Sequence, residues 1–392
     1  MKNLSVPEPA PAAMERSRAL SARIRAEMEA SASGVISFQR FMELALYEPV
    51  LGYYQSDSPK FGEEGDFVTA PEISFLFSRC IARQTQQILG ECRHGDVLEV
   101  GAGSGIMAAD LMAELDAQGV LPENYLILER SQALRQLQRA TIEARVPSLL
   151  PRFHWLDDLP GTGFRGVVVA NELLDAMPVG RFHVEEGQVR EWQVVWSDKK
   201  DHFDWQLTAP HPQLERAVRD IEEKLGERLP DGYSSEVHLS QVAWIKQIAE
   251  RLEQGLLLLL DYGYPRAEYY HPQRDSGTLV CHYRHRVHDE LLFLPGLQDM
   301  SVHVDFSAIA EAAADSMLEV AGFTTQRDFL IASGLLEFCT EVDPGSPHYL
   351  ALVQGVKTLT LPGEMGDMVK AMALTRGVDP VLLGFTGLDL LG

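Results

Sequence analysis

Several short apolar runs of this chain are followed directly by a polar residue. These residues are carboxylates and one amide, which can accept hydrogen bonds from hydroxyl groups, and the carboxylates can also accept protons. Four runs that resemble buried strands finish in carboxylates or an amide, at Glu129, Asp157, Asn171, Glu172 and Asp261. Because helical segments separate most of these runs, the pattern predicts an α/β fold with a doubly wound parallel sheet. Ligands of such sheets bind beyond the carboxyl ends of the strands, so we expect these side chains to share one edge.

A further apolar run, residues 96–100, ends in a turn that contains Gly101, Gly103 and Gly105 before a predicted helix. Glycine is needed where the backbone turns sharply and a ligand approaches closely. The exposed N–H groups of the following helix suit a nucleotide-like ligand. The dinucleotide fingerprint G-x-G-x-x-G would require glycine at Ile106, so NAD-dependent redox chemistry is the weakest interpretation.

Composition restricts the classes of protein to consider. The chain has 392 residues and a formal net charge of −23, which repels polyphosphates and disfavours a nucleic-acid partner. Its four cysteines are scattered without a C-x-x-C pair, which indicates reduced thiols rather than a zinc site or a disulfide frame. No apolar run is long enough to span a membrane, and the N-terminal residues lack signal-peptide and transit-peptide features. We therefore expect a cytoplasmic protein without membrane insertion and without a metal site.

The order of predicted elements divides the chain into five segments. In chain order they are an N-terminal tail and helix (1–30), a helical and loop-rich cap (31–91), the first half of the core (92–180), an inserted substrate-cleft subdomain (181–255) and the second half of the core (256–392). The insertion begins with an alternating pattern that predicts a β-hairpin turning at Gly187, and two helices follow. A helix near 307–321 and strands near 323–328 and 349–357 are predicted to complete the sheet.

Five stretches occur in an order that is typical of one family. They are Gly65–Ser74, Glu99–Gly105, Asn171–Val179, Asp261–Gly263 and Asp299–Phe306. With them the chain resembles the MidA family, which comprises bacterial proteins and the mitochondrial methyltransferase that assists assembly of respiratory complex I. The resemblance extends from about Ser37 to Phe385. It implies a Rossmann-like fold, S-adenosylmethionine (SAM) as cofactor, and an arginine of a protein as methyl acceptor, with a respiratory-complex subunit as one possible partner.

The glycine turn and the polar strand ends lead to a hypothesis about which residues bind the cofactor. The predicted set is Glu99, Gly101, Gly103, Gly105, Glu129, Asp157 and Asn171. In this set Glu129 accepts the ribose hydroxyls and Asp157 meets the adenine amine. The alternative interpretation of either acid is a helix cap or a surface charge.

An arginine acceptor places its own demands on the site, because a guanidinium is protonated at neutral pH and must lose a proton on methylation. Glu172 is our first catalytic candidate, because it stands just past the fourth predicted strand, where many methyltransferases place the residues that face the acceptor. Asp175 is the second, because it would point the same way if the segment is helical. Otherwise they cap a following helix. The predicted substrate-binding residues are Asp66, Thr69, Glu72, His303 and Asp305. The first three lie in an acidic glycine loop that covers the site or wraps the structure, and the last two line the cleft or bond across strands.

Two other functions remain open from the sequence. One is a SAM-binding assembly factor that acts by holding a partner subunit. The other is a methyltransferase for small molecules, which would keep the cofactor site but change the acceptor site. An open acidic cleft favours a protein arginine, whereas a closed apolar pocket favours a small molecule.

Overall fold

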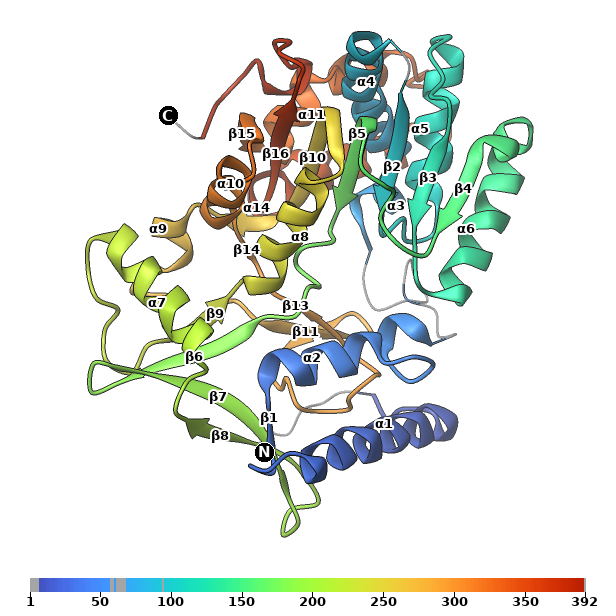
Figure 1. Cartoon of the computed structure of the whole chain (residues 1–392). Coiled ribbons are helices and arrows are strands. Elements are labelled where there is room, and N and C mark those ends of the chain that lie inside the picture. The colour runs from blue at the N-terminus through green and yellow to red at the C-terminus, as the bar shows by residue number, and fades with distance from the viewer. Residues whose placement is uncertain (1–6, 57–59, 61–67, 94, 391–392) are drawn as a thin grey trace. The chain divides into compact units, whose positions relative to one another are not determined.

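The computed structural model describes residues 7–56, 60, 68–93 and 95–390 (Figure 1). The chain separates into two compact units, each assembled from three stretches of sequence. Unit 1 contains residues 1–67, 175–242 and 264–308, and unit 2 contains residues 68–174, 243–263 and 309–392. The glycine turn and the polar strand ends predicted from the sequence belong to unit 2.

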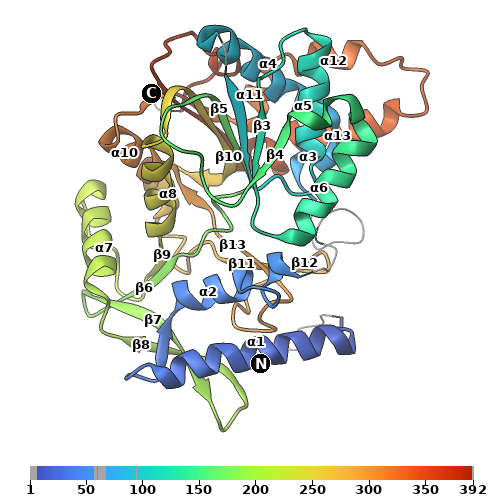
Figure 2. The same cartoon turned by 45° about the vertical axis from the view of Figure 1, so that its right-hand side comes forward.

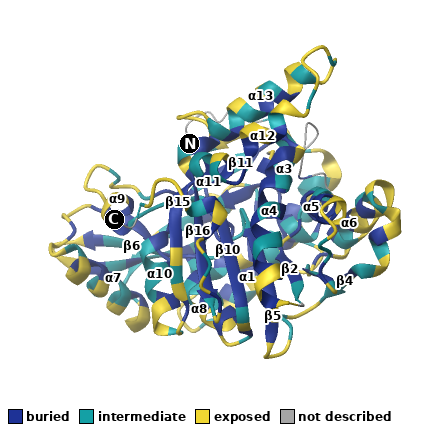
Figure 3. Ribbon diagram, turned by 90° about the horizontal axis from the view of Figure 1, so that it is seen from above, coloured by how far each residue is buried: buried dark blue, intermediate teal, exposed yellow. Residues whose placement is uncertain are grey.

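Unit 2 is built on a sheet with the strand order β15-β16-β10-β5-β2-β3-β4. Its strands are β2 (Asp96–Val100), β3 (Tyr125–Leu128), β4 (Phe153–Leu156), β5 (Phe164–Asn171), β10 (Leu252–Tyr264), β15 (Glu319–Thr325) and β16 (Val369–Arg376). The strands from β10 to β4 run parallel, whereas β16 is antiparallel to both β10 and β15. Leu256 to Leu260 of β10 are completely buried, as expected for a strand covered on both faces. Figure 3 shows these central strands in the colour of buried residues.

Helices cover both faces of this sheet. The helices of unit 2 are α3 (Ala70–Ile73), α4 (Phe75–Cys92), α5 (Ile106–Ala117), α6 (Gln132–Arg145), α8 (Leu239–Ala249), α10 (Phe306–Asp315), α11 (Gln326–Ala332), α12 (Leu335–Thr340), α13 (Tyr349–Thr360) and α14 (Met365–Met368). Of these, α12 packs on α4 and α11, and α13 packs on α3, α11 and α14. Apolar side chains of α4 and α5 join those of one sheet face in a single core, while α8 and α10 lie on the other face (Figures 1 and 2). The doubly wound α/β fold is therefore confirmed.

One strand predicted near the C-terminus is wrong. Residues 349–357 belong to helix α13, and the strand that completes the sheet between β10 and β15 is β16. A short apolar run does not distinguish a strand from a buried helix segment. The Leu, Ala and Gln residues of 349–357 favour a helix. In β16, pairing with two neighbouring strands outweighs the helix propensity of its Ala, Met and Leu residues.

Unit 1 combines two small sheets with helices. Its strands are β1 (Val35–Ser37), β6 (Gly180–Glu185), β7 (Gln188–Ser197), β8 (His202–Thr208), β9 (Ser234–Val237), β11 (Val280–Tyr283), β12 (Arg286–His288), β13 (Asp299–Ser301) and β14 (Val304–Asp305), and its helices are α1 (Pro11–Ala30), α2 (Phe38–Tyr47), α7 (Pro212–Leu225) and α9 (Arg266–Tyr269). The predicted hairpin is confirmed as β6 and β7, which turn at Gly187. Ser37 caps α2 by accepting the N–H of Arg40 at 3.2 Å.

The described part of the chain gives three further observations. None of its helices is long and apolar enough to cross a membrane. All four cysteines are free thiols, and three of them are buried. The described residues contain no group of three or more His, Cys, Asp or Glu side chains that could hold a metal ion.

Candidate cofactor and acceptor site

The glycine turn of unit 2 connects β2 to α5 and needs its glycines. Gly101, Gly103 and Gly105 have φ angles of 74°, 52° and 83°, in the left-handed region that residues with a side chain rarely adopt. A Cβ atom at Gly105 would lie 2.9 Å from the Cα of Gln138, too close for van der Waals contact. The glycine turn therefore packs closely against α6. The N–H groups at the start of α5 come directly after it, where they could bind a nucleotide-like ligand at the carboxyl end of β2.

Glu129 follows β3, and its carboxylate accepts hydrogen bonds from neighbouring residues of unit 2. Its Oε1 accepts the backbone N–H of Ser131 at 2.8 Å, and its Oε2 accepts Nε2 of Gln138 at 3.2 Å. Burial raises the pKa of Glu129, and the hydrogen bond from Ser131 opposes that shift. Each carboxylate oxygen offers two acceptor sites, so both oxygens keep capacity for a ribose hydroxyl. Its predicted role is compatible with this geometry.

Two other predicted cofactor residues already have protein partners. Asp157 follows β4, and its exposed carboxylate pairs with Arg135 at 2.7 Å. Glu99 lies in β2 with a side chain that is 1% exposed, and it accepts the hydroxyl of Tyr125 at 2.7 Å. Burial raises the pKa of Glu99 to about 7. Direct contact of Glu99 or Asp157 with the cofactor stays a prediction.

Glu172 stands immediately beyond β5 in an unusual backbone conformation. Its φ angle is 47°, and a residue other than glycine pays about 1 to 3 kcal/mol for such a conformation. The backbone N–H of Glu172 donates to the carbonyl of Leu260 at 2.8 Å. Its Oε1 accepts the N–H of Ala70 at 3.1 Å and Nδ2 of Asn171 at 3.2 Å. A strained position whose carboxylate is fixed in this way is typical of functional sites.

Asn171 contributes an acceptor to the same strand end. Its Oδ1 is buried, and it has no hydrogen-bond partner among the residues that the structure describes. Buried polar atoms without a partner are rare in folded proteins, so this oxygen is available to a ligand. Asn171 thus fits its predicted place in the cofactor site.

Asp261 supports the turn after β5, a role that the sequence analysis did not assign. It lies in β10 and is 1% exposed. Its Oδ2 accepts the N–H groups of Leu173 at 3.1 Å and Leu174 at 2.7 Å, and its Oδ1 accepts that of Tyr262. The adjacent strand therefore holds the backbone that carries Glu172. In the sequence, only its predicted place at the end of a strand pointed to Asp261, whereas β10 continues to Tyr264.

The acidic segment before α4 contacts both the glycine turn and the end of β5. Glu72 of α3 accepts a hydrogen bond from the hydroxyl of Ser104 in the glycine turn. Ala70 meets Glu172, and Thr69 is the residue before α3. Asp66 lies outside the described residues. These contacts place Glu72 at the glycine turn and Ala70 at the end of β5.

The remaining predicted site residues belong to unit 1. Residues 172–178 form no helix, so the condition on which Asp175 would point with Glu172 is not met. Asp305 is buried, accepts the N–H groups of Ser307 and Ala308 at the start of α10, and pairs with Arg266 at 3.3 Å. The ring of His303 packs 5.2 Å from that of Tyr264. Substrate contact by Asp175, His303 and Asp305 stays a prediction.

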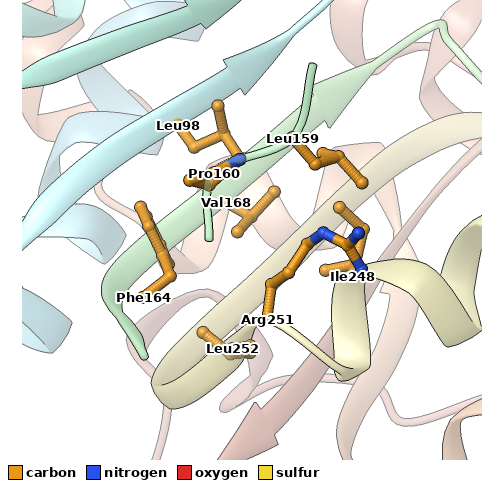
Figure 4. A pocket seen from close by; sticks show the side chains of 8 residues that line it. All are labelled: Leu98, Leu159, Pro160, Phe164, Val168, Ile248, Arg251 and Leu252. Atoms are coloured by element: carbon orange, nitrogen blue, oxygen red, sulfur yellow. The ribbon is translucent and has the colours of Figure 1, made fainter. Parts of the chain in front are cut away.

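A small apolar cavity in unit 2 lies away from this site (Figure 4). Its lining includes Phe164 and Leu252, the first residues of β5 and β10, and the volume is about 10 Å³. It therefore sits at the amino ends of the strands and has room for little more than one water molecule. The polar carboxyl ends of the strands are the better site for an adenosyl ligand, because they combine the glycine turn, Glu129 and the Asn171 oxygen that has no hydrogen-bond partner among the described residues.

Comparison with known proteins agrees with this geometry. A family model described as "Putative S-adenosyl-L-methionine-dependent methyltransferase" matches residues 79–324. A crystal structure of a COG1565 superfamily member from Burkholderia thailandensis, bound to S-adenosyl-homocysteine, is 40% identical. It covers 98% of this chain and 99% of its own, with a TM-score of 0.93. The chain belongs to the MidA family of SAM-dependent methyltransferases. The predicted cofactor is confirmed, because S-adenosyl-homocysteine is the demethylated form of SAM.

Curated relatives extend the comparison to mitochondrial proteins. Protein arginine methyltransferase NDUFAF7 of Danio rerio is 27% identical over 78% of this chain and 74% of its own length. The Drosophila melanogaster homologue of that protein is also 27% identical, over 92% of this chain and 85% of its own length. Both relatives are named as protein arginine methyltransferases.

Proposed function

We propose that this methyltransferase transfers the methyl group of SAM to an arginine of a protein acceptor. The observation that carries the proposal is the fixed carboxylate of Glu172 at the end of β5, with a second acid, Glu72, tied to the glycine turn. The names of the relatives from Danio rerio and Drosophila melanogaster, protein arginine methyltransferases, support the same acceptor.

The chemistry explains why carboxylates are needed. SAM supplies an activated methyl group on a positively charged sulfur. A guanidinium nitrogen forms a bond to the methyl carbon while the bond from that carbon to sulfur breaks. One proton leaves the same nitrogen, and the product remains a methylated guanidinium. A carboxylate that holds the guanidinium orients the nitrogen and accepts this proton.

Glu172 is the residue to which we assign this role. Hydrogen bonds from Ala70 and Asn171 hold its carboxylate, so this side chain is already oriented before the acceptor binds. Glu72 supplies a second negative charge within unit 2, which favours a cationic acceptor over a neutral one. The large negative net charge of the chain, −23, agrees with a basic partner.

We propose a respiratory-complex subunit as the first acceptor to test, in keeping with the family resemblance. The experiment incubates the protein and methyl-labelled SAM with a bacterial lysate, and mass spectrometry follows the label. Labelled methylarginine in a protein is the expected result. A labelled small metabolite without labelled protein would favour the small-molecule alternative. SAM binding without any transfer would favour an assembly factor that holds its partner.

A further inference from the structure

Gln138 is a buried polar residue on an otherwise apolar helix face. The buried residues of α6 are Leu134, Gln138 and Ile142, which lie one helical turn apart. Gln138 is 0% exposed, so its amide has been removed completely from water. Burial of an amide is unfavourable unless hydrogen bonds compensate it. The partners of this amide therefore indicate why a glutamine stands here.

Each hydrogen-bonding group of the Gln138 amide has a partner near the cofactor site. Oε1 accepts the indole N–H of Trp155 at 2.9 Å. An indole N–H can only donate, so the orientation of the amide follows from this contact. Nε2 then points at two acceptors, the carbonyl of Gly103 at 3.1 Å and Oε2 of Glu129 at 3.2 Å.

These three contacts connect the ends of neighbouring strands. Gly103 lies in the turn after β2, Glu129 follows β3, and Trp155 belongs to β4. The backbone of Gln138 also packs on the turn, since a Cβ atom at Gly105 would lie 2.9 Å from the Cα of Gln138. One side chain thus joins the glycine turn to the acid predicted to hold the ribose.

We propose that Gln138 is a positioning residue of the cofactor site, which holds the Glu129 carboxylate in the orientation that accepts the ribose hydroxyls. Nε2 occupies one acceptor site of Oε2 and thereby limits rotation of the carboxylate, while Ser131 restrains Oε1 in the same way. The remaining acceptor sites then face a ligand with a fixed geometry. The proposal depends on the role of Glu129, which the same experiment tests.

The test measures SAM binding to the full chain by isothermal titration calorimetry. Gln138→Met has nearly the same volume and flexibility but no N–H donor. Loss of a hydrogen bond to a charged group predicts a roughly ten- to hundredfold weaker SAM affinity. Gln136→Met is the matched control, because Gln136 lies exposed on the same helix. Thermal unfolding without ligand checks that each variant is folded, and Gln138→Asn replaces Gln138→Met if the latter shows no cooperative transition.

A second measurement separates positioning from general support of the fold. In a Glu129→Ala background, Gln138→Met should weaken SAM binding much less than it does in the wild type, since the carboxylate that it orients is gone. Equal losses in the two backgrounds would overturn the proposal, as would unchanged affinity in Gln138→Met. Normal SAM binding by Glu129→Ala alone would remove the premise and overturn it as well.

Discussion

The carboxylate of Glu172 accepts the backbone N–H of Ala70 at 3.1 Å, across 102 residues of sequence. The contact joins the segment before α4 to the end of β5. Glu72, two residues after Ala70, is bonded in turn to Ser104 of the glycine turn. The acidic segment is therefore attached to both the cofactor turn and the candidate catalytic acid. These two hydrogen bonds support the prediction that the acidic segment forms part of the site.

Glu172→Gln should reduce methyl transfer by about 10²- to 10⁴-fold, the usual contribution of a general base. The amide keeps the oxygen that accepts from Ala70 but cannot take up a proton. SAM affinity, measured by calorimetry, should stay near that of the wild type. Glu143→Gln, an exposed substitution on α6, is the control. Full activity of Glu172→Gln would exclude Glu172 as the base.

Ser104→Ala should loosen α3 locally. It removes the hydroxyl that donates to the carboxylate of Glu72, a hydrogen bond worth about 1.5 kcal/mol. Hydrogen–deuterium exchange of the backbone amides of Ala70, Glu72 and Ile73 should therefore become roughly tenfold faster, while exchange in the central strands stays unchanged. Ser148→Ala, at an exposed serine of the same unit, should have no such effect. If exchange at 70–73 does not respond, the hydroxyl does not hold this segment.

Asp261→Asn should impair turnover without abolishing SAM binding. The substitution removes the negative charge that accepts the N–H groups of Leu173 and Leu174, so the turn that carries Glu172 is less well held. We expect the free energy of unfolding to fall by about 2 kcal/mol and kcat to fall more strongly than SAM affinity. Denaturant unfolding and calorimetry measure the two effects. Wild-type kcat in a variant that is destabilised would show that Asp261 only supports the fold.

Glu99 should make stability depend on pH. Burial raises its folded-state pKa from 4.5 to about 7, so the folded protein binds one more proton than the unfolded chain between these values. The contribution of Glu99 to the free energy of unfolding is fully present below pH 4.5. It decreases by about 1.4 kcal/mol per pH unit as the pH rises to 7. Glu99→Gln cannot titrate, so its stability relative to the wild type should increase from pH 5 to pH 7 in urea unfolding. A constant difference between the two proteins would contradict this shift.

Local patterns in the sequence predicted much of unit 2. Apolar runs bounded by turn residues located β2, β3, β4, β5 and β10, because strands buried on both faces carry almost continuous apolar side chains. The same logic placed Glu129, Asp157, Asn171 and Glu172 at one edge, since parallel strands end on the same side of a sheet. The pattern failed at 349–357, where a short apolar run fits either a helix or a strand, and no strand was predicted at 369–376.

The sequence by itself determined the strand, glycine turn and helix of the cofactor site, because these depend on backbone preferences of neighbouring residues. Only the tertiary structure decided which side chains support that site. Gln138 is an ordinary helix residue in the sequence, and its contacts with Gly103, Glu129 and Trp155 exist only once three strands lie side by side. The contact between Glu172 and Ala70 likewise joins distant segments. No local preference encodes such pairs, since packing of the whole unit brings their atoms within hydrogen-bonding distance.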